Sequence, residues 1–257
     1  MAKSRFEYVK QFELEDPLLP HCWIVIRLDG KGFTRFSELH NFKKPNDEQA
    51  LRLMNRCAVE VLEAFPDIRI AFGESDEYSF VFSKTCKIYG RRSSKLVSLV
   101  TSCFSGNYVR WWPEHFPSQP LLCTPIFDGR AVCYPTDHIL RHYLAWRQAD
   151  THINNQYNTC FWALVHSGKS RTEAQDHLKG TQTAYKNELL FSEFGIKYGL
   201  LPVMFRKGSV VTRSRRQKTV KHAEDGTAVQ REGGEVTVTH EDIIDDAFWE
   251  TRPDILM

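Results

Sequence analysis

Residues 24–33 read IVIRLDGKGF, an apolar run that ends in an acid, a glycine, a lysine, a second glycine and an aromatic residue. The apolar and β-branched part, residues 22–28, predicts a buried strand. Asp29 and Gly30 alone would make an ordinary turn after that strand. The residues that follow them raise the question of which other part of the chain lies beside Asp29.

The segments that follow this strand predict an α+β fold. Residues 45–65 carry apolar side chains at helical spacing behind a cap at Asn46 or Asp47, and residues 91–112 predict a second helix. Three further strand-like runs lie at residues 67–72, 77–82 and 127–134. GESD, between the first two of them, is a hairpin signal. The order β-α-β-β-α-β predicts a ferredoxin-like antiparallel sheet with both helices on one face.

The second half of the chain, residues 136–257, predicts mainly helices. Thr136 is a suitable cap for a helix that residues 151–167 either continue or follow with another one. Residues 213–235 are charged, polar and poor in apolar side chains, which predicts a mobile loop or a frayed hairpin. We therefore expect a ferredoxin-like domain at residues 1–135, with the helical second half packed on it.

Bulk composition sets broad limits. The 257 residues carry a formal net charge of +2, so composition alone does not indicate a nucleic-acid binder, although one face could still be basic. The seven cysteines are scattered without a C-x-x-C pair, which favours a reducing compartment and argues against structural zinc. No apolar stretch is long enough for a membrane span, and the start does not read as a signal peptide. We expect a soluble cytoplasmic protein, with the nucleus or a mitochondrion also compatible.

A second acid, Asp76, lies in the turn between the second and third predicted strands. In a β-α-β-β-α-β sheet the first and third strands are antiparallel neighbours, so Asp29 and Asp76 should meet at one edge. Two close carboxylates repel each other unless a cation lies between them, and Mg²⁺ prefers oxygen ligands and substrate phosphates. We therefore predict a two-metal site for phosphoryl or nucleotidyl transfer, with the Gly30 carbonyl as a further ligand. Taken singly, each of these turns would usually be a plain solvated turn.

The loop after Asp29 suits a triphosphate beside those metals. Gly30 and Gly32 would let the backbone approach it closely, and Lys31 would add positive charge. Phe33 either packs under the loop or lies against a base.

Five motifs in this order resemble the tRNA(His) guanylyltransferase family: RLDGKGF at 27–33, KPND at 44–47, AFGESDEYSF at 71–80, AWRQADTHINNQYN at 145–158 and KNELLFSEF at 186–194. The resemblance extends over most of the chain. It implies a polymerase-palm fold and the addition of one guanosine to position −1 of tRNA(His). It also implies that ATP adenylylates the 5′ monophosphate, that the 3′-hydroxyl of GTP displaces AMP, and that pyrophosphate is then removed. A homotetramer is implied as well.

The resemblance further implies roles for single residues. Asp29, the Gly30 carbonyl and Asp76 would hold two Mg²⁺ ions, and the two acids would be catalytic. The nucleotide-binding residues would be Asp29, Gly30, Lys31, Gly32, Phe33, Thr34, Lys44, Asp47, Ser75, Asp76 and Lys95. The tRNA-binding residues would be His152, Asn154, Asn155, Asn158, Lys186 and Asn187. The chemistry is compatible, because lysines suit phosphates, a carboxylate such as that of Asp47 accepts hydrogen bonds from a guanine edge, and amides bind base edges.

Some positions depart from the family pattern or stay open. Thr34 stands where the family often has histidine, and Gln156 replaces a common leucine, so we expect Gln156 at the surface. Glu77 is either a third metal-site acid or structural. Arg213 and its basic neighbours form either a solvated loop or an RNA-binding arm. We expect the large aromatic residues of the helices to pack in the core or at a subunit interface: Trp111, Trp112, Phe116, Trp146, Phe161 and Trp162.

Two other classes of protein share parts of this pattern. A palm-fold nucleotide cyclase has the same topology and acids, but it gives no reason for the HINNQYN and KNE motifs. A non-catalytic RNA-binding module of similar topology uses aromatic residues on its sheet, and YSFVF at 78–82 resembles such a motif only superficially. The nucleotidyltransferase is therefore the leading hypothesis.

Overall fold

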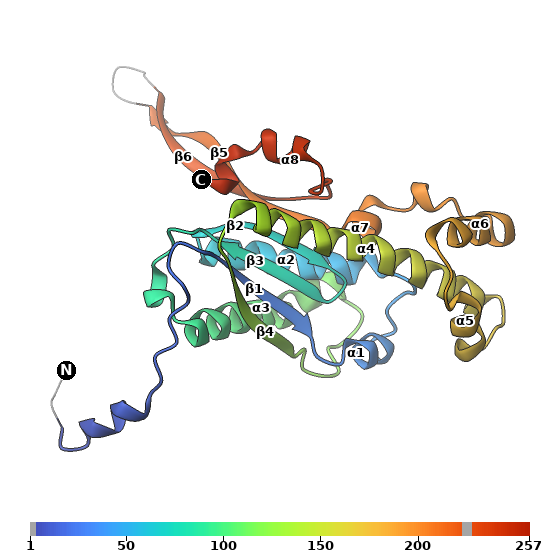
Figure 1. Ribbon diagram of the computed structural model, residues 1–257, viewed down its shortest axis with the longest axis horizontal. Helices are drawn as coiled ribbons and strands as arrows, with labels where there is room; N and C mark the ends of the chain where they lie inside the picture. Colours follow the sequence, from blue (N-terminus) through green and yellow to red (C-terminus); the bar gives the residue numbers. More distant parts are fainter. Residues whose placement is uncertain (1–3, 223–227) are drawn as a thin grey trace.

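The computed structural model describes the backbone of residues 4–222 and 228–257, and their side chains except those of residues 215–233. Six strands form one antiparallel sheet in the order β4-β1-β3-β2-β5-β6 (Figure 1). Their bounds are β1 (Trp23–Gly30), β2 (Ile68–Glu74), β3 (Glu77–Phe82), β4 (Phe127–Tyr134), β5 (Ser209–His222) and β6 (Ala228–Thr239). The first four lie where the sequence predicts strands, and the predicted α+β class is confirmed.

Helices of very different length surround this sheet. The α-helices of the described chain are α1 (Phe33–Leu39), α2 (Glu48–Ala64), α3 (Ser93–His115), α4 (Asp137–His166), α5 (Arg171–Leu178), α6 (Thr183–Phe194), α7 (Val203–Lys207) and α8 (Asp246–Glu250). Short 3₁₀ helices are η1 (Glu7–Phe12), η2 (Ile88–Arg91), η3 (Tyr198–Leu200) and η4 (Pro253–Leu256). Helix α4 answers one open question, because it runs without a break through residues 151–166.

Side-chain caps fix the start of the two helices that matter most for the site. Asp47 accepts hydrogen bonds from the backbone N–H groups of Gln49 and Ala50, at 3.0 and 3.1 Å, at the start of α2. Thr136 accepts one from the backbone N–H of Ile139, at 3.2 Å, at the start of α4. These bonds satisfy N–H groups that have no partner within their own helix.

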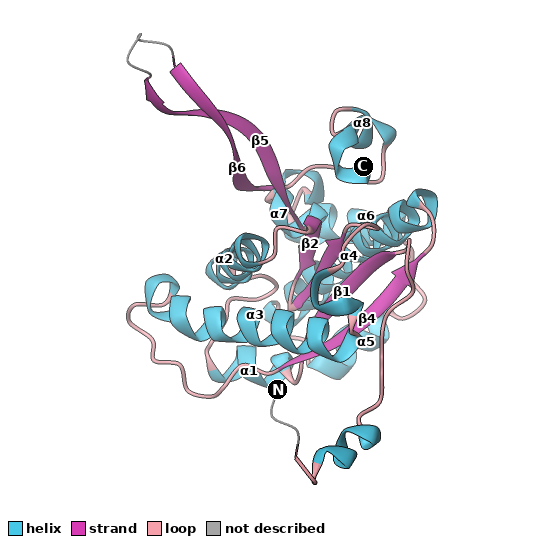
Figure 2. Ribbon diagram, turned by 90° about the vertical axis from the view of Figure 1, so that its left-hand side faces the viewer, coloured by secondary structure: helices cyan, strands magenta, loops and turns pink. Residues whose placement is uncertain are grey.

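The two faces of the sheet are covered by different helices (Figure 2). Helices α2 and α3 pack on one face, against alternating apolar residues of β1 such as Ile24 and Ile26. The other face packs Trp23 and Val25 against α4 and the C-terminal segment around α8. Because successive side chains of a strand point to opposite faces, β1 contributes to both cores. The sequence assigned the helices of the first face to the sheet, and it predicted the helix after Thr136 without saying which face it covers.

The second half of the chain also contributes two strands, which the prediction did not add to the sheet. Of the two alternatives for residues 213–235, the described backbone forms a hairpin, and residues 223–227 lie outside the described residues. Strand β5 pairs with β2, from Ile70 opposite Thr212 to Gly73 opposite Ser209, and β6 pairs with β5. Beyond the sheet the two strands continue as a projecting hairpin (Figure 2). Among the residues whose side chains are described, Val210 and Val211 at the base of the hairpin are fully buried and anchor it. Because residues 213–235 are mostly charged and polar, a prediction from their average composition does not show that the segment begins in the sheet.

Two further properties concern the chain as a whole. All seven cysteines are free thiols. Among the residues that the structure describes, no helix has both the length and the apolar character that a membrane span requires.

Candidate active site

The end of β1 and the β2–β3 turn meet at one edge of the sheet. Asp29 is the register partner of Glu77, and the backbone N–H of Gly30 donates a hydrogen bond to the carbonyl oxygen of Asp76, at 3.1 Å. Ser75, in the turn, has a φ of 49°, in the left-handed region that non-glycine residues seldom adopt. The structure therefore brings the segments of Asp29 and Asp76 together, as the strand order predicts.

Glycine is required at two positions of the loop after β1. A Cβ atom at Gly30 would lie 2.4 Å from the ring of Phe33 and 2.8 Å from the Cβ of Asp76. Gly32 has a φ of 72° immediately before α1. Phe33 packs under the loop, with its ring 4.8 Å from that of Phe36. The close approach at Gly30 therefore serves contacts within the protein itself.

Four acidic residues lie side by side across the sheet, one from each of four neighbouring strands: Asp128, Asp29, Glu77 and Glu74. Like charges directly opposite each other destabilise a sheet, so the row needs cationic partners. Asp128 has one in Arg130. Within the described residues, Asp29 and Asp76 form no ion pair. Burial raises the pKa of Asp76, and the carboxylate of Asp29 raises it further, although hydrogen bonds act in the opposite direction.

Arg147, from the middle of α4, is a cationic partner of the other two acids of the row that have one, Glu77 and Glu74. Its guanidinium lies 3.3 Å from Glu77 and 3.6 Å from Glu74, and it also pairs with Asp150. Only 5% of Arg147 is exposed. Burial raises the pKa of Glu74 to about 7, although the Thr151 hydroxyl and Arg147 act in the opposite direction. Arg147 thus holds the two residues that flank the Ser75–Asp76 turn.

Arg147 is not among the residues predicted from the sequence, although it lies inside the AWRQAD motif. The available signal was its spacing on α4. It follows Leu140 and Leu144, which are buried, at helical intervals, so it lies on the face that packs against the sheet. A cation on such a face indicates a buried anionic partner. Glu77, which the sequence left as a metal ligand or a structural acid, is that partner, together with Glu74.

A cavity of about 310 Å³ opens beside Asp76. The predicted site residues that line it are Phe33, Thr34, Lys44, Asp47, Ser75, Asp76 and Asn158. The Lys44 ammonium donates a hydrogen bond to the Ser37 hydroxyl, at 2.7 Å. Burial lowers the pKa of Lys44, and nearby Glu38 acts in the opposite direction. The volume is within the range of small-ligand sites. Lys31, by contrast, is exposed and does not line the cavity.

Asp47 has a structural role that the sequence analysis only half anticipated. One carboxylate oxygen caps α2, and the other accepts a hydrogen bond from the backbone N–H of Lys43, at 3.0 Å. The carboxylate therefore fixes the loop that carries Lys44. Contact with a guanine edge stays a prediction, for which lone pairs on both oxygens remain.

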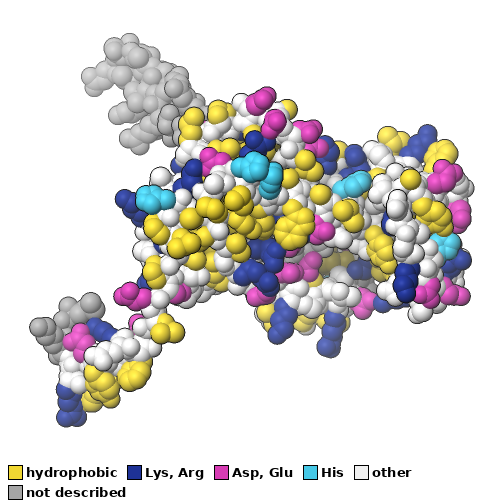
Figure 3. Space-filling view, in the orientation of Figure 1, with side chains coloured by type: hydrophobic (Ala, Val, Ile, Leu, Met, Phe, Trp, Pro, Cys, Tyr) yellow, Lys and Arg dark blue, Asp and Glu magenta, His cyan; other side chains and the backbone are white. Residues whose placement is uncertain are grey.

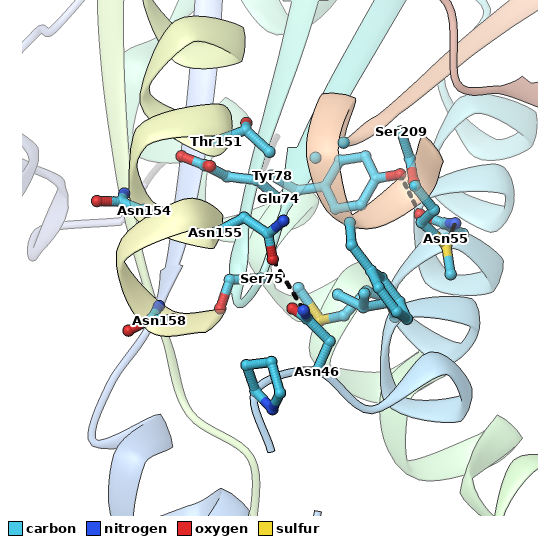
Figure 4. A pocket seen from close by; sticks show the side chains of 17 residues that line it. Asn46, Asn55, Glu74, Ser75, Tyr78, Thr151, Asn154, Asn155, Asn158 and Ser209 are labelled. Carbon is cyan, nitrogen blue, oxygen red and sulfur yellow. Dashed lines mark hydrogen bonds between the residues drawn. The ribbon is translucent and has the colours of Figure 1, made fainter. Parts of the chain in front are cut away.

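A smaller cavity of about 90 Å³ adjoins the first and is lined by amide side chains of α4 (Figure 4). Asn154 and Asn158 line it and are exposed. Asn155 is buried, accepts a hydrogen bond from Asn46 at 2.8 Å and donates one to the Tyr198 hydroxyl at 3.1 Å. Asn155 therefore ties the KPND loop to α4, whereas its two neighbours face the cavities.

Comparison with known proteins places this geometry in a family. The family model described as tRNAHis guanylyltransferase matches residues 6–135, and the model of the C-terminal domain of the same family matches residues 138–245. The chain belongs to the tRNA(His) guanylyltransferase family.

Relatives of known name support the same assignment. The chain is 56% identical to tRNA(His) guanylyltransferase 2 of Arabidopsis thaliana, with all of this chain and 48% of the relative aligned. It is 51% identical to the tRNA(His) guanylyltransferase of Schizosaccharomyces pombe, with 98% of this chain and 97% of the relative aligned. The chain thus spans about half the length of the Arabidopsis protein and nearly all of the yeast one.

Solved structures give the same fold. The guanylyltransferase of Saccharomyces cerevisiae superposes with a TM-score of 0.78 at 48% identity, over 81% of this chain and 93% of that one. A bacterial guanylyltransferase-like protein in complex with ATP superposes with a TM-score of 0.73 at 18% identity, over 98% of this chain and 96% of that one. The second match shows the shared fold alone.

The guanylyltransferase motif residues on α6 lie away from the larger cavity. The Lys186 ammonium donates a hydrogen bond to the Thr181 carbonyl, at 2.8 Å, and lines an open cleft together with Asn154. Asn187 accepts a hydrogen bond from Gln156, at 2.8 Å. Gln156 is only 2% exposed, so its predicted surface position is wrong. An amide side chain can replace leucine at position 156 because Asn187 accepts its hydrogen bond.

Two other predicted residues are also separate from the cavity. Lys95 lies near the start of α3, with its ammonium 5.0 Å from the centre of the Tyr89 ring. Thirteen residues of helix, about 20 Å, separate it from Tyr108, which lines the cavity. His152 is half-buried, with Nδ1 3.3 Å from the Tyr198 hydroxyl, and burial lowers its pKa. The roles of Lys95 and His152 stay predictions.

The residues at the sheet edge fit a hard divalent cation of the kind that the guanylyltransferase resemblance implies. In the described part of the chain, no three His, Cys, Asp or Glu side chains are grouped so that they could hold a metal ion. The predicted site has two carboxylates and the Gly30 carbonyl, so phosphate oxygens of a substrate would complete the shell. Among the described residues, no arginine pairs with Asp29 or Asp76, which suits this role.

Proposed function

We propose that the chain adds a guanosine to position −1 of tRNA(His), as its family membership suggests. The observation that carries this proposal is the meeting of Asp29 and Asp76, both without an ion-pair partner among the described residues, beside a cavity that contains Lys44. Two acids and a cation at a ligand-sized cavity are the arrangement that transfer of a nucleotidyl group requires.

The proposed reaction has three steps. An oxygen of the tRNA 5′-phosphate attacks the α-phosphorus of ATP, and pyrophosphate leaves. The 3′-hydroxyl of GTP then attacks the tRNA 5′-phosphorus and loses its proton, and AMP leaves. Hydrolysis finally removes pyrophosphate from the added guanosine. The bacterial relatives solved in complex with ATP and with GTP support the use of both nucleotides.

We assign residues of this chain to these steps as follows. Asp29, the Gly30 carbonyl and Asp76 would hold two Mg²⁺ ions, which when bound would neutralise phosphate charge and make a bound hydroxyl more acidic. Lys44 would pair with a phosphate, and Asp47 would keep its loop in place. Ser75 and residues 29–34 would line the nucleotide.

The remaining assignments rest on the family resemblance. Asn154, Asn158, His152 and Lys186 would contact the tRNA, with Asn187 held beside them by Gln156. A homotetramer in the cytoplasm is the assembly and compartment that we propose. Residues 1–135 would supply the catalytic acids, and residues 136–257 would complete the cavities through α4 and α7.

One assay tests this function. The purified chain is incubated with 5′-monophosphorylated tRNA(His), Mg²⁺, ATP and labelled GTP, and the RNA is resolved at single-nucleotide resolution. We expect a tRNA one nucleotide longer at its 5′ end. A cyclic nucleotide with unchanged tRNA would instead identify a cyclase, and tight tRNA binding without reaction would identify an RNA-binding module.

A further inference from the structure

Trp146, in the AWRQAD motif, is exposed on α4, so of its two predicted places the core is wrong and a subunit interface stays a prediction. In this chain 55% of Trp146 is exposed. One side of its ring lies against the Arg147 guanidinium, 4.0 Å from the ring centre, and its neighbour Tyr143 lies 6.2 Å away. Neither the packing of the sheet nor the proposed chemistry accounts for so large an exposed ring.

The orientation of the Trp146 ring is fixed by Arg147, on which it stacks. Arg147 is itself held by Glu77 and Glu74, at 3.3 and 3.6 Å, so it cannot move without breaking a buried network. A guanidinium stacked on indole stabilises the pair by a cation–π interaction. Trp146 therefore presents its remaining surface to solvent with little freedom to lose on binding a flat ligand.

Trp146 is linked to the proposed catalytic acid Asp29 through Arg147 and Glu77. Arg147 connects it to Glu77, the register partner of Asp29. On the same face of the sheet, Arg27 of β1 and Arg130 of β4 are register partners, two residues from Asp29 and Asp128 along their strands. That spacing is about 7 Å. Figure 3 shows basic side chains beside exposed apolar ones on the face that carries α4.

These features favour a nucleic acid over a second protein as the ligand of this surface. A stable protein interface needs a largely apolar centre. The neighbours of Trp146 on α4 include the charged Arg147 and Asp150, and the α4 face of β1 and β4 carries Arg27, Arg130 and Asp128. A rigid exposed indole with arginines nearby is the combination that binds single-stranded RNA, because every base offers a flat face and every nucleotide a phosphate.

We propose that Trp146 stacks an unpaired base of the RNA substrate, with Arg130 beside the neighbouring phosphate, and so holds the RNA end at Asp29. This inference rests on the proposed function, since it takes the RNA to be that substrate. It adds a base-stacking position that lies outside both cavities. The contact tolerates any base, so it aids positioning of the RNA end and does not select a sequence.

The test compares Trp146→Ala with Trp146→Phe, and uses Ile139→Ala as a matched control. Ile139 is also exposed, at 41%, and lies seven residues earlier on the same helix. Affinity for 5′-monophosphorylated tRNA(His) is measured by filter binding with Mg²⁺ and without nucleotides. We expect Trp146→Ala to weaken binding about tenfold or more, Trp146→Phe to retain most of it, and Ile139→Ala to leave it unchanged.

Two further measurements separate stacking from a merely structural role. The KM for tRNA should rise in Trp146→Ala while the KM for GTP stays constant. The fluorescence that wild type has in excess of Trp146→Phe should be quenched when tRNA is added. Unchanged tRNA affinity in Trp146→Ala would overturn the inference. So would a loss of subunits in sedimentation velocity, because it would make Trp146 an interface between copies of the chain.

The proposed reaction and the stacking position can fail separately, because extension of tRNA and binding of tRNA are measured in different assays. If wild type fails to extend tRNA while Trp146→Ala still weakens tRNA binding, the proposed reaction fails and the stacking position stands. If wild type extends tRNA and Trp146→Ala binds it equally well, only the stacking position fails.

Discussion

The two faces of the central sheet have opposite chemistry. On the face that α2 and α3 cover, the side chains of β1 and β3 are buried and apolar or aromatic, as at Ile26, Leu28 and Phe80. On the face that α4 covers, apolar residues at the far end give way to Arg27 and Asp29 near the active-site edge. The same strands supply both sets, because their side chains alternate.

This difference shows how one sheet can be stable and reactive at once. Burial of apolar surface on the α2–α3 face supplies favourable free energy that does not depend on any charge. The α4 face carries a row of four carboxylates, which Arg147 and Arg130 compensate only in part. Asp29, inside this row, and the nearby Asp76 have no ion-pair partner among the described residues, so these two acids are left for ligands.

The largest effect is expected where the charge is uncompensated. Asp29→Asn and Asp76→Asn should each reduce guanosine addition by at least about 10²–10³-fold, since each removes a charge that the transition state requires. The fold should persist, because the substitution relieves repulsion. Transfer to labelled tRNA(His) and urea unfolding measure the two properties.

Asp128→Asn is the matched control for these variants. It belongs to the same acidic row, but its carboxylate is exposed and paired with Arg130. Transfer should stay within a few-fold of wild type. Substantial activity in Asp29→Asn or Asp76→Asn would contradict their catalytic role. An equal loss in Asp128→Asn would show that the unpaired acids are not special.

The compensated part of the row should respond mainly in stability. Arg147→Met removes the arginine that pairs with buried Glu74 and leaves Glu77 only Arg27, at 3.9 Å, which should lower the free energy of unfolding by about 3–5 kcal/mol. Activity should fall as well, because those two residues flank Asp76. Combining Arg147→Met with Glu74→Gln and Glu77→Gln should restore much of the stability, as measured by urea unfolding.

An exposed ion pair gives the contrast for Arg147. Arg52 pairs with Glu48 on the surface of α2. Arg52→Met should change the free energy of unfolding by only about 0.3–0.5 kcal/mol. If the loss in Arg147→Met were as small, the buried network would not hold the Asp76 turn.

The apolar face should lose stability without losing chemistry. Phe104 of α3 is fully buried, with its ring 5.0 Å from Phe127 and 5.8 Å from Tyr78. Phe104→Ala should cost about 3–5 kcal/mol of stability through the cavity it leaves. Transfer activity per folded molecule should be retained. Val109→Ala, at an exposed position of the same helix, should change stability by about 0.5 kcal/mol or less.

The apolar face is also the part that the sequence predicts well. Strand and helix periodicities at residues 22–28 and 45–65 are strong because each element buries one face only. The meeting of Asp29 and Asp76 follows from strand order alone. The metal-binding role that this meeting suggests stays a prediction, since two acids at one sheet edge need a cation.

The α4 face was harder to predict for physical reasons. The partners of Arg147 lie about 70 residues away, and no local pattern shows which acids pair with it. Gln156 was placed at the surface because an isolated glutamine is usually exposed, whereas Asn187 satisfies it in the interior. Burial of a polar side chain depends on a tertiary partner, which a single sequence does not identify.

The smallest effect is expected at Asn155, where a buried amide joins the α4 face to the nucleotide loop. Asn155→Ala removes the acceptor of the Asn46 amide and the donor to the Tyr198 hydroxyl, which keeps its contacts with His152; this should lower stability by about 1–3 kcal/mol. Asn154→Ala, next to it but exposed, should change stability by about 0.5 kcal/mol or less. Freeing Asn46 also loosens the loop of Lys44, so the KM for nucleotide should rise more than kcat falls. If instead tRNA affinity alone fell in Asn155→Ala, with stability and nucleotide KM unchanged, Asn155 would contact RNA directly. The buried hydrogen bonds would then be dispensable.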